Sequence, residues 1–296
     1  MSRLTGIIAA VPTPFTADGS QVDVAAVRAT TERLIAGGIH GIVPTGTTGE
    51  FHVLSVEEYR TVVKAYIDAA AGRVPVVPGM GCMTIKAAIA TVQFCEKAGA
   101  DAVMVVPPFY DPLPYALLKN FLTQVCASVS IPIMYYNLPG ATGIHLNADQ
   151  IRELGQIKGL DYMKDTSGNA KEQVDVLTRS NENGSFTLLN GWDTLTFSAL
   201  ALGATAAVWG VATILPREAV ELYEALAVKG DLTAARQQWK LLWAVSDFLE
   251  SVPYPSGIKA GLDIIGASAG PIREPAAPLS SDEYQRFEVI LSKRKY

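Results

Sequence analysis

The sequence has few of the residues that build disulfide frameworks or metal sites. Its 296 residues include three cysteines and three histidines, with no C-x-x-C pair and no Cys/His cluster. These scattered residues are Cys82, Cys95, Cys126, His40, His52 and His145. Disulfide scaffolds and zinc sites need paired or closely spaced ligands. We therefore expect neither, with the cysteines buried as small apolar side chains.

Charge is also scarce, and long basic or apolar runs are missing. Charged residues make up 18% of the chain and the formal net charge is -5, with only a short "KRK" at the C-terminus. Such a chain offers no basic field to a phosphate backbone. The N-terminal "MSRLTGIIAAVPTPF" has a short apolar run broken by prolines, unlike a signal peptide or a spanning helix. We expect a cytoplasmic protein with no nucleic-acid or membrane partner.

Eight short apolar, β-rich runs recur along the chain, and segments with helical periodicity separate them. The runs begin near residues 6, 41, 74, 101, 131, 159, 186 and 204. The segments 24–38 and 56–71 show the helical spacing well. Regular alternation predicts parallel strands joined by helical crossovers, and eight such units predict an α/β fold, the closed (β/α)8 TIM barrel.

An open doubly wound sheet is the alternative, but it usually carries a glycine-rich phosphate loop after its first strand. Here "VPTPF" follows instead. Beyond residue 224 the pattern becomes helical without strands, in 231–252 and 280–293, with a Pro/Gly-rich link between them. The sequence therefore predicts a barrel over residues 1–224 and a C-terminal helical appendage over 225–296.

The segment "PTGTTGE" (44–50) follows the second predicted strand and carries Thr47 and Thr48. Barrel enzymes place their active sites at the C-terminal ends of the strands. A small-residue turn with two hydroxyls can donate several hydrogen bonds to an anion of the size of a carboxylate. The alternative is a tight turn whose hydroxyl groups cap the following helix.

The segment "DYMKDTSG" places Lys164 at the end of the sixth predicted strand. A lysine at such a position is commonly solvated or paired, and Asp165 is a candidate partner. Strand alternation, however, puts Lys164 on the same face as Leu160 and Tyr162, opposite Asp165. If that face is the barrel lumen, lost hydration disfavours the ammonium form and leaves an amine able to attack a ketone.

An imine formed in this way would need a nearby group that moves protons. Tyr135 and Tyr136 end the neighbouring fifth strand, and alternation allows only one of them to face the lumen. Aromatic packing is the alternative role for both, and composition does not choose between the two residues.

Three segments in this order, "GTTGE", "YNLPGATG" (136–143) and "MKDTSG" (163–168), resemble the dihydrodipicolinate synthase and N-acetylneuraminate lyase family of class I, pyruvate-type aldolases. The similarity runs from about residue 4 to about residue 290 and includes "PGMG", "PPFY" and "IKAGLDIIG". The resemblance implies a barrel with C-terminal helices and no metal or organic cofactor.

The resemblance also implies roles for individual residues. Lys164 matches the imine-forming lysine and Tyr136 the proton-transferring tyrosine. Thr47 and Thr48 match the residues that bind the keto acid's carboxylate, and Val208 matches a position whose backbone carbonyl lines the site. Tyr110 matches a tyrosine that reaches across a dimer interface, which implies a homodimer or a homotetramer built as a dimer of dimers.

Four positions bear on the second substrate. Dihydrodipicolinate synthases carry an arginine where this chain has Ala141, so a carboxylate-binding contact is missing. Asp193 matches a hydroxyl-binding aspartate of the sialic acid lyases, but Thr194 stands where those lyases have a glutamate. We expect Trp209, where a small residue is usual, to fill space near the substrate tail.

These residues together predict a Schiff-base lyase that cleaves or condenses a 2-keto acid such as pyruvate and an aldehyde, with a 2-keto-3-deoxy sugar acid as the expected substrate class. A dehydratase acting on such a sugar acid is the first alternative. Dihydrodipicolinate synthesis and a non-catalytic regulator that binds a keto acid are the others.

Overall fold

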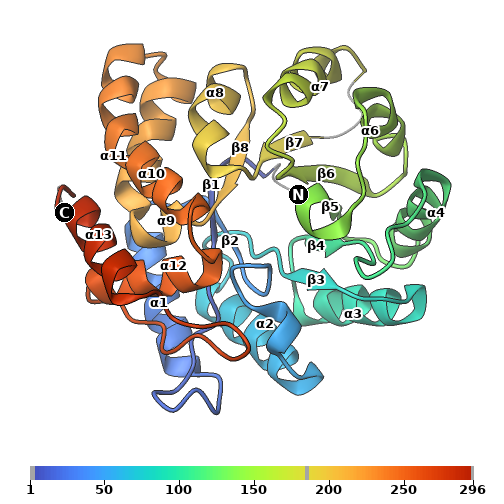
Figure 1. Cartoon of the computed structure of the whole chain (residues 1–296). Coiled ribbons are helices and arrows are strands. Elements are labelled where there is room, and N and C mark those ends of the chain that lie inside the picture. The colour runs from blue at the N-terminus through green and yellow to red at the C-terminus, as the bar shows by residue number, and fades with distance from the viewer. Residues whose placement is uncertain (1–3, 184–186, 295–296) are drawn as a thin grey trace.

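The computed structural model describes residues 4–183 and 187–294, and its centre is a barrel of eight parallel strands (Figure 1). The strands are β1 (Gly6–Ala10), β2 (Gly41–Val43), β3 (Gly79–Gly81), β4 (Val103–Val106), β5 (Ile133–Asn137), β6 (Leu160–Asp165), β7 (Thr187–Asn190) and β8 (Ala206–Trp209). They pair in the order β2-β1-β8-β7-β6-β5-β4-β3. Ile42 of β2 forms a parallel bridge with Val76, which lies just before β3, and this bridge closes the barrel between β2 and β3. The predicted (β/α)8 fold is confirmed; residue 186, where the seventh strand was expected to begin, lies outside the described residues.

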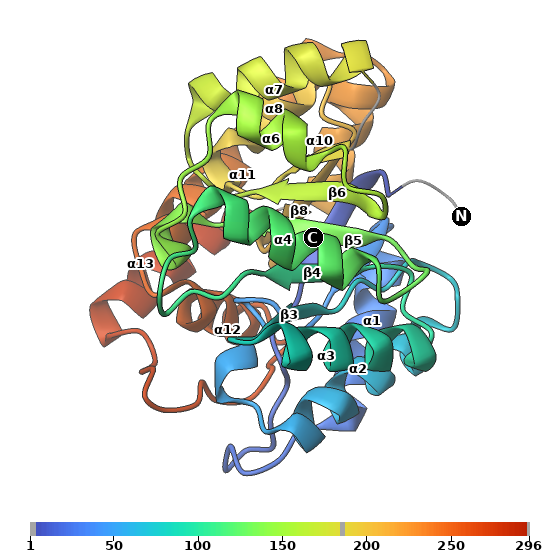
Figure 2. The ribbon, with the colours of Figure 1, turned by 90° about the vertical axis from the view of Figure 1, so that its right-hand side faces the viewer.

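Helices surround the barrel and follow the strands in turn (Figures 1 and 2). They are α1 (Val24–Ala36), α2 (Val56–Ala70), α3 (Ile85–Ala98), α4 (Tyr115–Cys126), α6 (Ala148–Leu154), α7 (Ala170–Asn183), α8 (Thr196–Ala201) and α10 (Pro216–Tyr223), with the short α5 (Pro139–Thr142) and α9 (Val211–Ile214) at strand ends. Side chains at several helix starts accept a hydrogen bond from the first turn, as Asp23, Ser55 and Thr84 do.

Alternation along the strands separates the lumen from the layer between strands and helices. Ile8, Met104 and Tyr162 belong to the buried cluster inside the barrel. Leu160 packs instead against helix residues, so its predicted place beside Tyr162 and Lys164 is wrong. The pairing of β5 with β6 is irregular at this point, because Ile133 pairs with Leu160 and Met134 with Tyr162. Because β6 has one extra residue here, Leu160 faces the helices although Tyr162, two positions later, faces the lumen.

The C-terminal region consists of α11 (Leu232–Glu250), α12 (Tyr254–Ile264) and α13 (Ser281–Leu291). In Figure 2 the arrow of β6 points toward the side of the molecule that carries α12 and α13. Barrel residues such as Trp209 share one buried cluster with Leu242 and Phe287 of this region. The boundary expected at 224 and 225 falls where α10 continues into a π-helical turn, Glu224–Val228. The C-terminal region therefore packs against the barrel and lies on the side where the strands end.

Candidate active site

A cavity of about 250 Å³ lies at the C-terminal end of the barrel. Its lining includes Thr47, Thr48, Tyr136, Lys164, Asp193 and Val208, together with Ala10, Leu138, Thr166, Gly191, Trp192, Gly210, Leu249, Glu250, Val252 and Tyr254. Residues from the strands, from the loop after β2 and from the C-terminal region thus meet in one small space. Six of the residues expected from sequence are among them.

Lys164 is only 7% exposed and points into this cavity from the end of β6. In the strand register it lies directly beside Tyr136 of β5, and its Nζ is 4.0 Å from the centroid of the Tyr136 ring. Asp165 is on the other face, where it accepts hydrogen bonds from Asn137 Nδ2 (2.8 Å) and Ser167 Oγ (3.1 Å). Burial raises the pKa of Asp165. The expected inward placement of Lys164 is confirmed, and Asp165 is not its partner.

The two tyrosines of β5 take opposite sides of the strand. Tyr136 belongs to the cluster inside the barrel, whereas Tyr135 packs in the layer beneath the helices. Burial raises the pKa of Tyr135, and its hydroxyl has no hydrogen-bond partner among the described residues. The hydroxyl that can serve Lys164 is therefore that of Tyr136.

Gly191 leaves the space that the Lys164 side chain occupies. A Cβ at position 191 would lie 2.5 Å from Lys164 Cε and 2.4 Å from Thr166 Oγ1. Thr166 Oγ1 also donates a hydrogen bond to Gly191 O (3.0 Å), which fixes the approach of the two strand ends. Any larger residue at 191 must displace the lysine.

We expect Gly191→Ala to lower turnover about 100-fold by moving Lys164, since a misplacement of about 1 Å can have that effect. Steady-state kinetics would measure the loss, and circular dichroism would check the fold. Gly140→Ala is the matched control, because a Cβ at 140 meets no atom within 4 Å. Full activity in Gly191→Ala would contradict this prediction, because it would mean that Lys164 accommodates the added Cβ without losing its catalytic position.

The turn after β2 presents Thr47 and Thr48 to the cavity, and it does not cap α2. The cap of α2 is Ser55, whose hydroxyl accepts from Glu58 N–H (3.1 Å) in a capping box. Thr45 holds the start of the turn, donating from Oγ1 to Gly79 O (2.8 Å). Of the two roles that the sequence left open, helix capping is thereby excluded for Thr47 and Thr48.

Asp193 forms a polar wall of the cavity together with residues of the C-terminal region. It is 5% exposed, and its Oδ2 accepts a hydrogen bond from Tyr254 Oη (2.7 Å). Burial raises the pKa of Asp193 to about 7; the nearby Glu250 adds to this, while Tyr254 and Lys164 oppose it. Burial also raises the pKa of Tyr254. Asp193 can therefore accept or donate a proton near neutral pH.

Within the described residues, no group of three or more His, Cys, Asp or Glu side chains is placed to hold a metal ion. In the same ranges, no helix is both long and apolar enough to cross a membrane.

The sequence model of the Dihydrodipicolinate synthetase family matches residues 3–294. The chain belongs to this family. The 4-hydroxy-tetrahydrodipicolinate synthase of Methanothrix thermoacetophila is 37% identical over 291 residues, covering 97% of this chain and 96% of that protein. The synthase of Methanospirillum hungatei is 34% identical, covering 97% and 98%. The chain is accordingly a pyruvate-dependent, aldolase-type lyase of the lysine Schiff-base class.

Solved structures of the family agree with the fold. Dihydrodipicolinate synthase from Bacillus anthracis has a TM-score of 0.94 at 28% identity and covers all of both chains. A prophage protein of the family from E. coli K12, solved in complex with pyruvate, has a TM-score of 0.92 at 30% identity, covering 99% of each chain.

Three expected residues lie outside the cavity lining. Trp209 was expected to fill space near the substrate tail, and this is wrong: it is 1% exposed and packs on Trp239 of α11, with ring centroids 6.1 Å apart. Val208 faces the lumen, so its neighbour on the strand must face the helices. Although it lies outside the lining, the Trp209 indole lowers the pKa of Asp193.

The other two expected residues outside the lining are exposed. Ala141 lies on α5, and Tyr110, which follows β4, is 91% exposed.

Several lining residues were missed from sequence. Thr166 had a usable signal, because it stands two positions after Lys164 and so shares its face. Tyr254 and Glu250 come from the C-terminal region, where nothing local marks them. Glu250 accepts hydrogen bonds from Thr194 N–H (2.8 Å) and Thr194 Oγ1 (3.0 Å), which ties the loop after β7 to α11.

Proposed function

We propose that this family member forms an imine between Lys164 and pyruvate or another 2-keto acid, and that it cleaves or forms a carbon–carbon bond to a hydroxylated aldehyde. The observation that carries the proposal is the register of β5 and β6, which sets Lys164 beside Tyr136 in a cavity that also holds Thr47 and Thr48. Pyruvate is supported by the related prophage protein solved with it.

Each residue then has one task. The Lys164 amine attacks the keto carbon, and loss of water leaves a protonated imine. Thr47 and Thr48 hold the carboxylate with hydroxyl and backbone N–H groups. In cleavage, Tyr136 takes the proton from the substrate hydroxyl as the carbon–carbon bond breaks, and the electron pair moves into the imine to give an enamine. Protonation of the enamine and hydrolysis release pyruvate.

The charges of the cavity favour a hydroxylated second substrate over a second carboxylate. Lys164 is the only Lys or Arg among the described residues that line it, and Asp193 and Glu250 add two acidic side chains. A second carboxylate would find no further basic side chain in this lining, whereas sugar hydroxyls would find hydrogen-bond acceptors. Ala141 adds no cation at the rim. We therefore propose a 2-keto-3-deoxy sugar acid, although the relatives named above carry the name of the synthase.

We expect Asp193→Asn to lower kcat/KM for a 2-keto-3-deoxy sugar acid about 10- to 100-fold, the range for losing a hydrogen bond to a charged group. Borohydride trapping with pyruvate alone should persist, because the proposal assigns the carboxylate of pyruvate to Thr47 and Thr48 and gives Asp193 contact only with the aldehyde portion of the substrate. Asp161→Asn is the control, since Asp161 is exposed on β6. Dihydrodipicolinate as the dominant product of the parent protein would contradict the proposed substrate class.

Dehydration is the second candidate, favoured by the pKa of Asp193 near 7. A protonated Asp193 could supply the proton with which the hydroxyl β to the imine carbon leaves as water. Scoring pyruvate release and water loss separately, over a panel of 2-keto-3-deoxy acids, distinguishes the two reactions.

We also propose that two copies of the chain associate through the face that carries Tyr110, as a homodimer or within a homotetramer. Tyr110 is 91% exposed and Phe109 beside it is 36% exposed, which is unusual for adjacent aromatic residues. Sedimentation of the full chain would test the assembly, and a monomer at micromolar concentration would contradict it.

A further inference from the structure

A buried ion pair lies outside the cavity, at the end of the turn that carries Thr47 and Thr48. Lys259 of α12 and Glu50 are 3% and 2% exposed. Lys259 Nζ is 2.7 Å from Glu50 Oε1 and donates to Pro271 O (2.6 Å). Burial lowers the pKa of Lys259 and Glu50 opposes that shift. Glu50 and Lys259 are 209 positions apart, and no local sequence pattern predicts that they pair.

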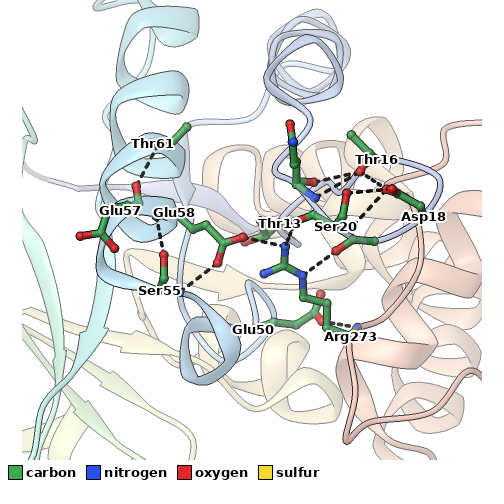
Figure 3. A network of polar contacts seen from close by, with 12 residues as sticks. Thr13, Thr16, Asp18, Ser20, Glu50, Ser55, Glu57, Glu58, Thr61 and Arg273 are labelled. Carbon is green, nitrogen blue, oxygen red and sulfur yellow. Dashed lines mark hydrogen bonds and ion pairs between the residues drawn. The ribbon is translucent and has the colours of Figure 1, made fainter.

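Arg273 holds the other oxygen of Glu50 and extends the network (Figure 3). Its backbone N–H donates to Glu50 Oε2 (3.1 Å), and its guanidinium donates to Glu58 Oε1 (2.7 Å) and Gly19 O (2.9 Å). The Phe15 ring lies close to both cations, 3.8 Å from Arg273 Cζ and 4.3 Å from Lys259 Nζ. The C-terminal region is thereby fastened to the loop after β1 and to the start of α2.

The backbone of the turn needs such support. Thr45 and Glu50, which bracket it, both have φ of 55°, a left-handed conformation that costs energy for residues other than glycine. Thr45 is held by its hydrogen bond to Gly79. At the other end, Thr13 Oγ1 donates to Gly49 O (2.6 Å) and the Glu50 side chain is held by Lys259 and Arg273.

Position 50 is coupled directly to the substrate-binding residues. The Glu50 N–H donates to Thr47 O (3.1 Å), so a rotation of the backbone at Glu50 moves Thr47. A buried ion pair gives little net stability compared with apolar residues of the same size. The contribution of this ion pair is geometric, because it holds Glu50 in the left-handed backbone conformation that a residue with a side chain rarely adopts.

We propose that the Glu50–Lys259 ion pair positions the turn of Thr47 and Thr48 for binding the keto acid's carboxylate. Both members act through the turn and touch no substrate, so they are positioning residues. The inference rests on the proposed function, in which these threonines bind that carboxylate. It gives the C-terminal region a part in substrate affinity in addition to its part in the fold.

The test uses Glu50→Gln/Lys259→Met, which removes both charges and leaves no unpaired one. Borohydride trapping across pyruvate concentrations gives the half-maximal concentration and the maximal rate, and thermal unfolding gives the midpoint. We expect the half-maximal concentration to rise about tenfold or more while the maximal rate stays within about threefold, the pattern for lost binding without lost chemistry. The unfolding midpoint should stay close to that of the parent protein.

Two further variants sharpen the test. Glu50→Gly/Lys259→Met should restore affinity to within about threefold of the parent, because glycine adopts the left-handed conformation without a side-chain cost. Glu32→Gln/Arg73→Met removes an exposed ion pair remote from the turn and should change nothing. Parental affinity in a folded Glu50→Gln/Lys259→Met protein would overturn the inference.

If that double variant does not fold, Thr13→Val decides. It replaces one hydroxyl by a methyl group and releases Gly49 O in the same turn. We expect a rise of about three- to tenfold in the half-maximal concentration, as for loss of one hydrogen bond. An unchanged value would overturn the inference. Failure of the parent protein to form any adduct would instead contradict the proposed function.

Discussion

Lys164→Ala should abolish turnover, with a loss of about 10⁴-fold or more, since the variant lacks the nucleophile on which every later step depends. The reduced pyruvate adduct should disappear with it. Lys164 lowers the pKa of the buried Asp193, but Asp193 keeps its hydrogen bond from Tyr254 when the lysine is truncated, so the variant should fold. Steady-state kinetics and mass spectrometry after borohydride treatment measure both effects.

Lys119→Ala is the control for this experiment. Lys119 is partly exposed on α4, where it pairs with Glu153, and its loss should leave both turnover and adduct intact. Persistence of substantial turnover in Lys164→Ala would be incompatible with imine catalysis at this position.

Tyr136→Phe should lower kcat about 10²- to 10⁴-fold, the range for removing a general acid–base group. The ring that packs against Lys164 remains in the variant, so the amine keeps its surroundings and loses only the hydroxyl. An adduct with pyruvate should still form, more slowly. Stopped turnover with a surviving adduct would distinguish lost proton transfer from a lost nucleophile.

Tyr135→Phe offers a closely matched control one residue away. Its hydroxyl lies on the opposite side of β5, buried and without a partner in the described part of the chain, so removing it should leave kcat unchanged. Equal losses in the two variants would mean that the strand, and not the Tyr136 hydroxyl, supports activity.

Strand alternation explains most of what the sequence could predict of this site. Applied to "DYMKDTSG" and to Tyr135 and Tyr136, it places one lysine and one tyrosine in the lumen, as the structure does. It fails at Leu160, where an irregular pairing between β5 and β6 reverses the facing. The prediction for Trp209 was wrong because strand alternation was not applied there. It relied on the small residue usual at that position in the family and on the size of the tryptophan side chain.

The contribution of the C-terminal region could not be read from the sequence. Helix α12 begins at Tyr254, between two prolines, and contains Gly257 and Gly261, residues that weaken a helix prediction. The packing explains Gly261: a Cβ there would lie 2.4 Å from Ile214 Cδ1. The contacts of Tyr254 with Asp193 and of Lys259 with Glu50 join residues far apart in the chain, and no local pattern encodes them.

The central claim is that Lys164 is the amine that binds the keto acid. The most direct measurement is peptide mapping of the intact protein after incubation with pyruvate and borohydride. We expect one reduced pyruvate per chain, on the peptide that contains Lys164. No adduct, or an adduct confined to another lysine, would contradict the account.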